Sequence, residues 1–165
     1  MSYKDYIREV PDFPIKGVSF KDISPLLANQ KLFEECIDEM GLLVDMPDYW
    51  IGIDARGFIF ASALSMIHGG GGVVMCRKAG KLPPTVFSHS YGTEYSEDTI
   101  QIKQGSGTAV IVDDVLATGG TLQATNHLAE IAGYDVIDNL VLIDLLYLPT
   151  VKDFNLQVKS LIQYE

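Results

Sequence analysis

The stretch that decides the fold is VIVDDVLATGGTLQAT, residues Val110–Thr125. Ala109–Val112 is a continuous apolar run, which is typical of a central parallel strand covered on both faces. Two adjacent aspartates, Asp113 and Asp114, follow this run. A loop of small residues then leads into Thr121–Ala132, whose apolar spacing predicts a helix. The order of strand, acidic turn, glycine-containing loop and helix indicates part of a βαβ unit.

The rest of the chain repeats this alternation. Apolar segments predict strands at Trp50–Ile53, Val73–Cys76, Val136–Leu146 and Ser160–Tyr164. Helical spacing predicts helices at Lys31–Val44 and Gly57–Ile67. Between them, the pattern predicts a long mobile loop at Arg77–Ser90 and an antiparallel hairpin at Tyr91–Ile102. We therefore expect an α/β protein with a central, mostly parallel sheet flanked by helices.

Composition limits the classes of function. The 165 residues are 47% hydrophobic and 21% charged, as expected of one globular domain with a sizeable core. The net charge of −10 argues against a nucleic-acid partner. No apolar run reaches the roughly 18 residues of a membrane span, and the charged start MSYKDYIREV predicts no secretory signal. Cys36 and Cys76 stand far apart, which indicates reduced thiols in a cytoplasmic protein.

The loop Ala117-Thr118-Gly119-Gly120-Thr121 has the features of a phosphate site. It joins a strand end to a helix start, where unpaired N–H groups and the helix dipole favour an anion. The sequence contains neither the GxxxxGK[ST] nor the GxGxxG pattern. The two ionised aspartates beside it can only accept hydrogen bonds, so they suit sugar hydroxyls. Together these features indicate a sugar phosphate such as ribose 5-phosphate rather than a helix cap with a surface charge.

Positive charge gathers at one place in an acidic chain. Of twelve Lys and Arg residues, Arg77, Lys78 and Lys81 fall within five positions. The alternative interpretation is a solvated basic loop, but this cluster is the local exception in a chain whose overall field repels anions.

These motifs resemble those of a known family. VIVDDVLATGGT is similar to the phosphoribosyl-pyrophosphate signature of type I phosphoribosyltransferases, and ATGGT resembles their adenine branch. PDFPIKGVSFKDISPLL, DARGF, RKAGKLP, SYGTEY and QYE resemble the same branch in the same order, over nearly the whole chain. The resemblance implies the type I phosphoribosyltransferase-like fold in a single domain. It has a small N-terminal hood at about residues 1–30 and a core at about 31–165, with a flexible lid loop at 77–102.

The resemblance also implies an activity and its requirements. The expected enzyme is a purine salvage pentosyltransferase that converts adenine and 5-phosphoribosyl 1-pyrophosphate to AMP and pyrophosphate. Mg²⁺ would be held mainly by the pyrophosphate and ribose of the substrate, with no direct protein ligand. The basic arm at Arg77–Lys81 would reach the active site of a partner subunit, which implies a homodimer. Small molecules are the expected partners, with no nucleic acid and no membrane.

Four residues receive catalytic roles from the resemblance. Glu94 would face the imidazole edge of the base and act as an acid, with a pKa raised by burial. Asp113 and Asp114 would hold the ribose hydroxyls and stabilise positive charge on the sugar. Arg56 would clamp the pyrophosphate, and the turn before it predicts a cis peptide at Asp54–Ala55.

A larger set is expected to bind substrate. Phe20 would stack on the purine and Val115 would cover its other face. The full set is Ser19, Phe20, Lys21, Arg77, Lys78, Lys81, Tyr95, Val115, Ala117, Thr118, Gly119, Gly120 and Thr121.

Two departures from the family pattern leave alternatives open. Ser19-Phe20-Lys21 stands where an aliphatic residue, Phe and Arg are usual, and a lysine near the base could donate to O6 of hypoxanthine or guanine. TEYS stands where LEYG is usual, so the lid could close differently. The same reaction on a 6-oxopurine is therefore the second hypothesis. A non-catalytic regulator that binds phosphoribosyl pyrophosphate, or a flavodoxin-like phosphate-binding module, would be a different class.

Overall fold

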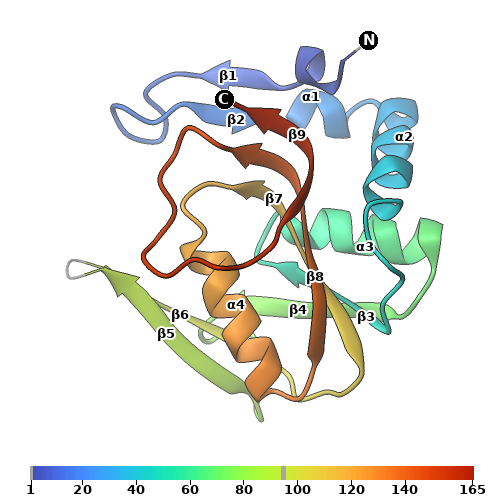
Figure 1. The fold of residues 1–165 in the computed structure, drawn as a ribbon, viewed down its shortest axis with the longest axis vertical. Helices are drawn as coiled ribbons and strands as arrows, with labels where there is room; N and C mark the ends of the chain where they lie inside the picture. Colours follow the sequence, from blue (N-terminus) through green and yellow to red (C-terminus); the bar gives the residue numbers. More distant parts are fainter. Residues whose placement is uncertain (1, 94–95) are drawn as a thin grey trace.

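The computed structural model describes residues 2–93 and 96–165. Its centre is a seven-stranded sheet in the order β5-β6-β4-β3-β7-β8-β9 (Figure 1). The strands are β3 (Tyr49–Ile53), β4 (Gly72–Lys78), β5 (Phe87–Thr93), β6 (Ser96–Ile102), β7 (Thr108–Leu116), β8 (Asp135–Leu145) and β9 (Lys159–Tyr164). Strands β4, β3, β7, β8 and β9 are mutually parallel, and the hairpin β5–β6 joins β4 antiparallel. The predicted α/β class with a mostly parallel sheet is confirmed.

Helices cover both faces of the sheet. α2 (Gln30–Gly41) and α3 (Gly57–His68) lie on one face, and α4 (Gly120–Ile131) lies on the other (Figure 1). α2 begins where the Asn29 side chain accepts a hydrogen bond from the Leu32 N–H at 3.2 Å, a polar cap of the first turn. No helix within the described ranges is long and apolar enough to cross a membrane.

Strand β7 carries the core on both sides. Val110 and Val112 belong to the hydrophobic cluster under α2 and α3, whereas Ala109 and Ile111 belong to the cluster under α4. Successive side chains of a strand point to opposite faces, so a strand between two helical layers must be apolar at every position. This explains the continuous apolar run at the start of the decisive stretch.

A second sheet lies near the N-terminus. β1 (Arg8–Val10) and β2 (Phe20–Asp22) pair antiparallel, after the short helical turn η1 (Tyr3–Tyr6) and before the short helix α1 (Ser24–Leu27). This pair lies beside the C-terminal strand β9 (Figure 1). The division of the chain into hood, core and lid remains a prediction.

The segment Arg77–Ser90 was expected to be a long loop, but only its middle part, residues 79–86, lies between strands. Strand β4 continues through Arg77 and Lys78, which pair with Gln101 and Ile100 of β6, and β5 already begins at Phe87. The expectation was wrong because the backbone of this segment pairs with β6 although its side chains show no hydrophobic period.

Candidate functional site

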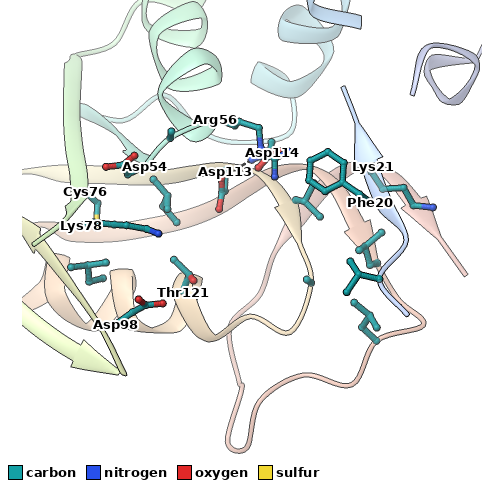
Figure 2. A pocket seen from close by; sticks show the side chains of 18 of the residues that line it. Phe20, Lys21, Asp54, Arg56, Cys76, Lys78, Asp98, Asp113, Asp114 and Thr121 are labelled. Carbon is teal, nitrogen blue, oxygen red and sulfur yellow. Dashed lines mark hydrogen bonds and ion pairs between the residues drawn. The ribbon is translucent and has the colours of Figure 1, made fainter. Parts of the chain in front are cut away.

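A cavity of about 560 Å³ lies at the carboxyl ends of the parallel strands, between β2, the hairpin β5–β6 and the start of α4 (Figure 2). This is where parallel sheets are expected to bind ligands. Of the residues that the sequence predicted for the site, those lining the cavity are Ser19, Phe20, Lys21, Arg56, Lys78, Asp113, Asp114, Val115, Ala117 and Thr121. Segments far apart in the sequence thus meet at one cavity, as the sequence analysis expected.

The two aspartates lie inside strand β7 and not in a loop after it. β7 runs to Leu116, and Asp113 pairs with Val141 of β8. The expected strand end at Val112 was therefore wrong. Because neighbouring side chains of a strand alternate, Asp113 and Asp114 point to opposite faces, as Figure 2 shows. Alternation directs the two carboxylates to different faces, although the charge of Asp114 still raises the pKa of Asp113.

Asp114 is a buried carboxylate that contacts a guanidinium. Its side chain is 5% exposed, and Arg56 Nε lies 2.8 Å from its Oδ2. The contact brings opposite charges together without the alignment of a hydrogen bond, so Oδ2 has no hydrogen-bond partner among the described residues. A buried acceptor of this kind is available to a ligand hydroxyl, and Arg56 offsets part of the cost of its charge.

Asp113 occupies a less favourable environment for a charge. Its Oδ1 accepts a hydrogen bond from the backbone N–H of Asp114 at 2.9 Å. Burial, and next the charge of Asp114, raise the pKa of Asp113 well above its usual value. A ligand that brings hydroxyl donors or positive charge to Asp113 would favour its ionised form.

The loop after β7 forms a small anion-sized recess. Thr118, Gly119, Gly120 and Thr121 line a cavity of about 110 Å³ that adjoins the larger one. Gly119 has a φ of +83° and precedes the first turn of α4, whose N–H groups lack intrahelical acceptors. This geometry suits a phosphate monoester.

Tyr91, which was not among the predicted site residues, contacts a residue of this recess from the main cavity. Its hydroxyl lies 2.9 Å from Thr121 Oγ1, and both residues line the main cavity. Two residues before it on the same face of β5, the His89 ring contacts the His127 ring of α4 at 4.7 Å. The hairpin is therefore joined to the phosphate-loop helix at two points. The alternation of His89 and Tyr91 could have predicted a strand here, but the segment up to Ser90 was expected to be a loop.

The three clustered cations do not converge in this chain. Lys78 lines the cavity, but Arg77 Nε lies 3.2 Å from Asp54 Oδ2 and its guanidinium stacks on Phe58 at 5.6 Å. Lys81 is exposed and outside the lining. Lys78 is therefore the one of the three that faces the cavity within this chain.

The turn after β3 contains the predicted cis peptide at Asp54–Ala55, which is confirmed. The predicted acid Glu94 and its neighbour Tyr95 lie outside the described residues, so their roles stay predictions.

The far end of the cavity is apolar and aromatic. Phe20 lines it, with Phe13 packed edge-on at 5.2 Å and the Arg56 guanidinium 5.0 Å from the ring centroid. Leu145, Tyr147 and Leu148 also line it, and sequence reasoning missed them. They lie at and just after the carboxyl end of β8, where parallel sheets bind ligands, so this rule would have found them.

Lys21 does not serve as a base contact through its ammonium. Its Nζ lies 2.5 Å from Glu9 Oε1 and 4.2 Å from the centroid of the Tyr164 ring, and Figure 2 shows it directed away from Phe20 and the cavity. Donation from Lys21 to O6 of a 6-oxopurine, which the sequence left open, is not supported by this geometry.

The cavity offers oxygen ligands but no preformed metal cage. Asp54, Asp98, Asp113 and Asp114 line it, yet the part of the chain that the structure describes contains no group of three or more His, Cys, Asp and Glu placed to hold an ion. This donor set fits Mg²⁺, which keeps waters and binds through one or two carboxylates together with substrate phosphates.

Comparisons with known proteins agree with this geometry. The sequence profile of the phosphoribosyl transferase domain matches residues 22–155. The adenine phosphoribosyltransferase of Bdellovibrio bacteriovorus is 45% identical over 99% of this chain and 100% of that protein.

Solved structures give the same result. The adenine phosphoribosyltransferase of Thermoanaerobacter pseudethanolicus is 38% identical, with a TM-score of 0.90 over 98% of both chains. That of Saccharomyces cerevisiae, complexed with D-2,5-dideoxy-2,5-imino-altritol 1,6-bisphosphate and adenine, is 32% identical. Its TM-score is 0.84 over 96% of this chain and 95% of its own.

Proposed function

Since this chain belongs to the adenine phosphoribosyltransferase family, we propose that it transfers the 5-phosphoribosyl group of 5-phosphoribosyl 1-pyrophosphate to adenine, giving AMP and pyrophosphate. One observation carries the proposal. The small recess adjoins the main cavity, which is lined by two aspartates of β7 and by the aromatic side chain of Phe20. Recess, aspartates and aromatic ring follow one another in the order in which a nucleotide presents phosphate, ribose and base.

In this proposal the phosphate and ribose are held first. The N–H groups of the Ala117–Thr121 loop and the hydroxyls of Thr118 and Thr121 bind the 5′-phosphate. Asp113 and Asp114 accept hydrogen bonds from the ribose hydroxyls. As the bond from C1 to the pyrophosphate oxygen breaks, positive charge develops on the ring, and both carboxylates are placed to stabilise it.

The leaving group and the base complete the reaction. Arg56 and Lys78 neutralise the departing pyrophosphate, because a guanidinium fork and an ammonium both suit phosphate oxygens. Purine N9 then bonds to C1, and the proton that the base loses passes to the departing pyrophosphate. Glu94 remains the proposed acid at the imidazole edge, and Tyr95 a proposed contact to the pyrophosphate. Mg²⁺, when bound through the pyrophosphate and ribose, supplies further charge neutralisation.

Adenine is preferred over a 6-oxopurine in this proposal. The ammonium of Lys21 is occupied by Glu9 and the Tyr164 ring, so it offers no donor to an O6 atom. The base would then be read by the backbone around Ser19 and Lys21 and sandwiched between Phe20 and Val115. The yeast relative was solved with adenine, which supports the same choice.

We also propose a cytoplasmic homodimer. The exposed aliphatic side chains Ile59 and Met66 of α3 lie one helical repeat apart, and Val73 and Met75 are exposed on one face of the neighbouring strand β4. Exposed apolar surface of this kind favours a second subunit. The exposed Lys81 would then be free to reach toward the partner. Sedimentation equilibrium would contradict this if it gave a monomer at micromolar concentration.

The decisive experiment is a substrate panel with adenine, hypoxanthine, guanine and xanthine. With phosphoribosyl pyrophosphate and Mg²⁺, we expect pyrophosphate release with adenine at a kcat/KM at least about 100-fold above that for the other three bases. This ratio is expected because a site that hydrogen-bonds the N6 donor and N1 acceptor of adenine leaves its own groups unpaired with a 6-oxopurine. Preference for hypoxanthine or guanine would establish the 6-oxopurine alternative. No turnover despite tight phosphoribosyl-pyrophosphate binding would indicate a regulator.

A further inference from the structure

We propose that Lys21 is a positioning residue that fixes Phe20 at the base end of the cavity, by joining the two-stranded sheet β1–β2 to the C-terminal strand β9. The inference rests on the proposed function, because it assigns the base to Phe20. In it, the side chain of Lys21 affects the affinity for adenine without touching adenine.

The register of β1–β2 gives Lys21 this position. Glu9 pairs directly with Lys21, and Val10 pairs with Phe20. Phe20 and Lys21 are neighbours in a strand, so their side chains leave opposite faces. Phe20 therefore faces the cavity, and Lys21 faces β9 (Figure 2).

The contacts of Lys21 fix it firmly. The residue is 5% exposed, although it carries a charge that is costly to bury without partners. Glu9 Oε1 lies 2.5 Å from its Nζ, and the Tyr164 ring lies 4.2 Å from it, which supplies an ion pair and a cation–π contact. Tyr164 in turn pairs with Leu145 of β8, which lines the cavity. A short chain of contacts thus connects the sheet that carries Phe20 to the main sheet.

The small sheet needs such a connection. β1 and β2 are three residues each, and an isolated two-stranded pair of this length is not stable in water. The loop between them, residues 11–19, is exposed almost throughout. The position of Phe20 therefore depends on what holds β2 to β9.

This arrangement separates the two substrates. The carboxylates of β7 and the loop at Gly119 that follows β7 are positioned by the main sheet. Phe20 meets them through Arg56, whose guanidinium lies 5.0 Å from the Phe20 ring and whose Nε lies 2.8 Å from Asp114 Oδ2, and Asp114 should still hold Arg56 when β1–β2 loosens. Loosening β1–β2 should weaken the binding of the base and leave the binding of the ribosyl substrate unchanged. A general loss of structure would affect both substrates.

The test compares KM for adenine, at saturating phosphoribosyl pyrophosphate and Mg²⁺, with KM for phosphoribosyl pyrophosphate at saturating adenine. For Lys21→Met, which keeps the length of the side chain, we expect KM for adenine to rise at least about 10-fold and the other KM to change less than 2-fold. Lys21→Arg keeps the charge and should return KM for adenine to within about 3-fold of wild type. The matched control is Lys4→Met, because Lys4 Nζ lies 4.7 Å from the same Tyr164 ring but is exposed and outside β1–β2. It should change neither KM.

Three results would overturn the inference: equal rises in both KM values, an unchanged KM for adenine in a folded Lys21→Met variant, or failure of Lys21→Arg to restore it. If Lys21→Met does not fold, as judged by circular dichroism, Glu9→Gln makes the same test. It leaves Lys21 its ring contact and should raise KM for adenine about 3-fold, whereas no rise would overturn the inference. The proposed function fails separately, if the wild type itself does not use adenine.

Discussion

Replacing Gly119 by alanine should weaken phosphate binding for two separate physical reasons. The φ of Gly119 is +83°, a conformation that L-residues adopt at a cost of about 1–2 kcal/mol. An added Cβ would also lie 2.5 Å from Phe154 Cε2 and 2.7 Å from its Cδ2. Such overpacking typically costs about 1–3 kcal/mol. If the loop relieves both costs by leaving its binding geometry, the binding free energy weakens by about 2–5 kcal/mol, which lowers the affinity at least about 30-fold.

The two costs can be measured separately. In Gly119→Ala/Phe154→Ala the ring is gone, so only the backbone cost remains, and the affinity should be about 5- to 30-fold below that of Phe154→Ala. The matched control is Gly120→Ala. Its φ is not positive, and an added Cβ would lie at an ordinary 3.6 Å from Val151 Cγ1. This variant should bind within about 2-fold of wild type, because alanine is compatible with the first turn of a helix.

The assay is calorimetric titration with phosphoribosyl pyrophosphate in the presence of Mg²⁺, with thermal unfolding recorded for each variant. Ribose 5-phosphate serves as a second ligand that lacks the pyrophosphate. The reasoning is refuted if Gly119→Ala binds both ligands as tightly as wild type, or if Gly120→Ala loses as much affinity as Gly119→Ala.

Three further predictions concern two side chains of the same site. Asp113→Asn should lower kcat by at least about 100-fold, because it removes one charge aimed at the developing cation, and steady-state kinetics measures this. Since burial and Asp114 raise the pKa of Asp113, the folded state holds its proton more tightly than the unfolded state. Stability is therefore lost as the pH rises through the raised pKa. At pH 7.5 the ligand-free Asp113→Asn variant should then unfold at a higher temperature than wild type. Near pH 4 the two unfolding temperatures should be similar. A lower unfolding temperature of the variant at pH 7.5 would contradict the raised pKa of Asp113. Tyr91→Phe removes the hydroxyl that lies 2.9 Å from Thr121 Oγ1. It should raise KM for phosphoribosyl pyrophosphate about 2- to 10-fold and leave KM for adenine unchanged. A change confined to KM for adenine would contradict this prediction.

The elements that sequence alone predicted best are those whose apolar pattern is complete. Ala109–Val112 is strand because both of its faces are covered, and an unbroken apolar run has no other stable position in a sheet. The predicted strand Val136–Leu146 corresponds to β8 (Asp135–Leu145), in which the apolar run Leu140–Ile143 is buried. The loop between β7 and α4 followed from the small residues between the predicted strand and helix, and its binding of a phosphate stays a prediction. In each case the information is local, because a few neighbouring residues determine both the conformation and the chemistry.

The features that sequence missed depend on pairing with distant segments. Aspartate is disfavoured in strands, so β7 was expected to end at Val112, but pairing with β8 carries it through Asp113 to Leu116. The direction of Lys21 could not be read because β1 and β2 have only three residues each. Their register is set by Glu9, Tyr164 and a nine-residue loop, and a shift of one residue would exchange the faces of Phe20 and Lys21.

The placement of two carboxylates within one strand explains how the site can be strongly acidic and still bind a polyanion. Alternation gives each aspartate a different face and a different environment. Asp114 has Arg56 at 2.8 Å, so its charge is already offset before any ligand arrives. Arg56 also lowers the pKa of Asp113, but less than burial and Asp114 raise it, so the folded protein holds this charge at a cost. In the proposed reaction, ribose hydroxyls, and more so a ring that becomes cationic as pyrophosphate leaves, would offset that cost. The arrangement would then favour the charge distribution of the transition state over that of the bound reactant.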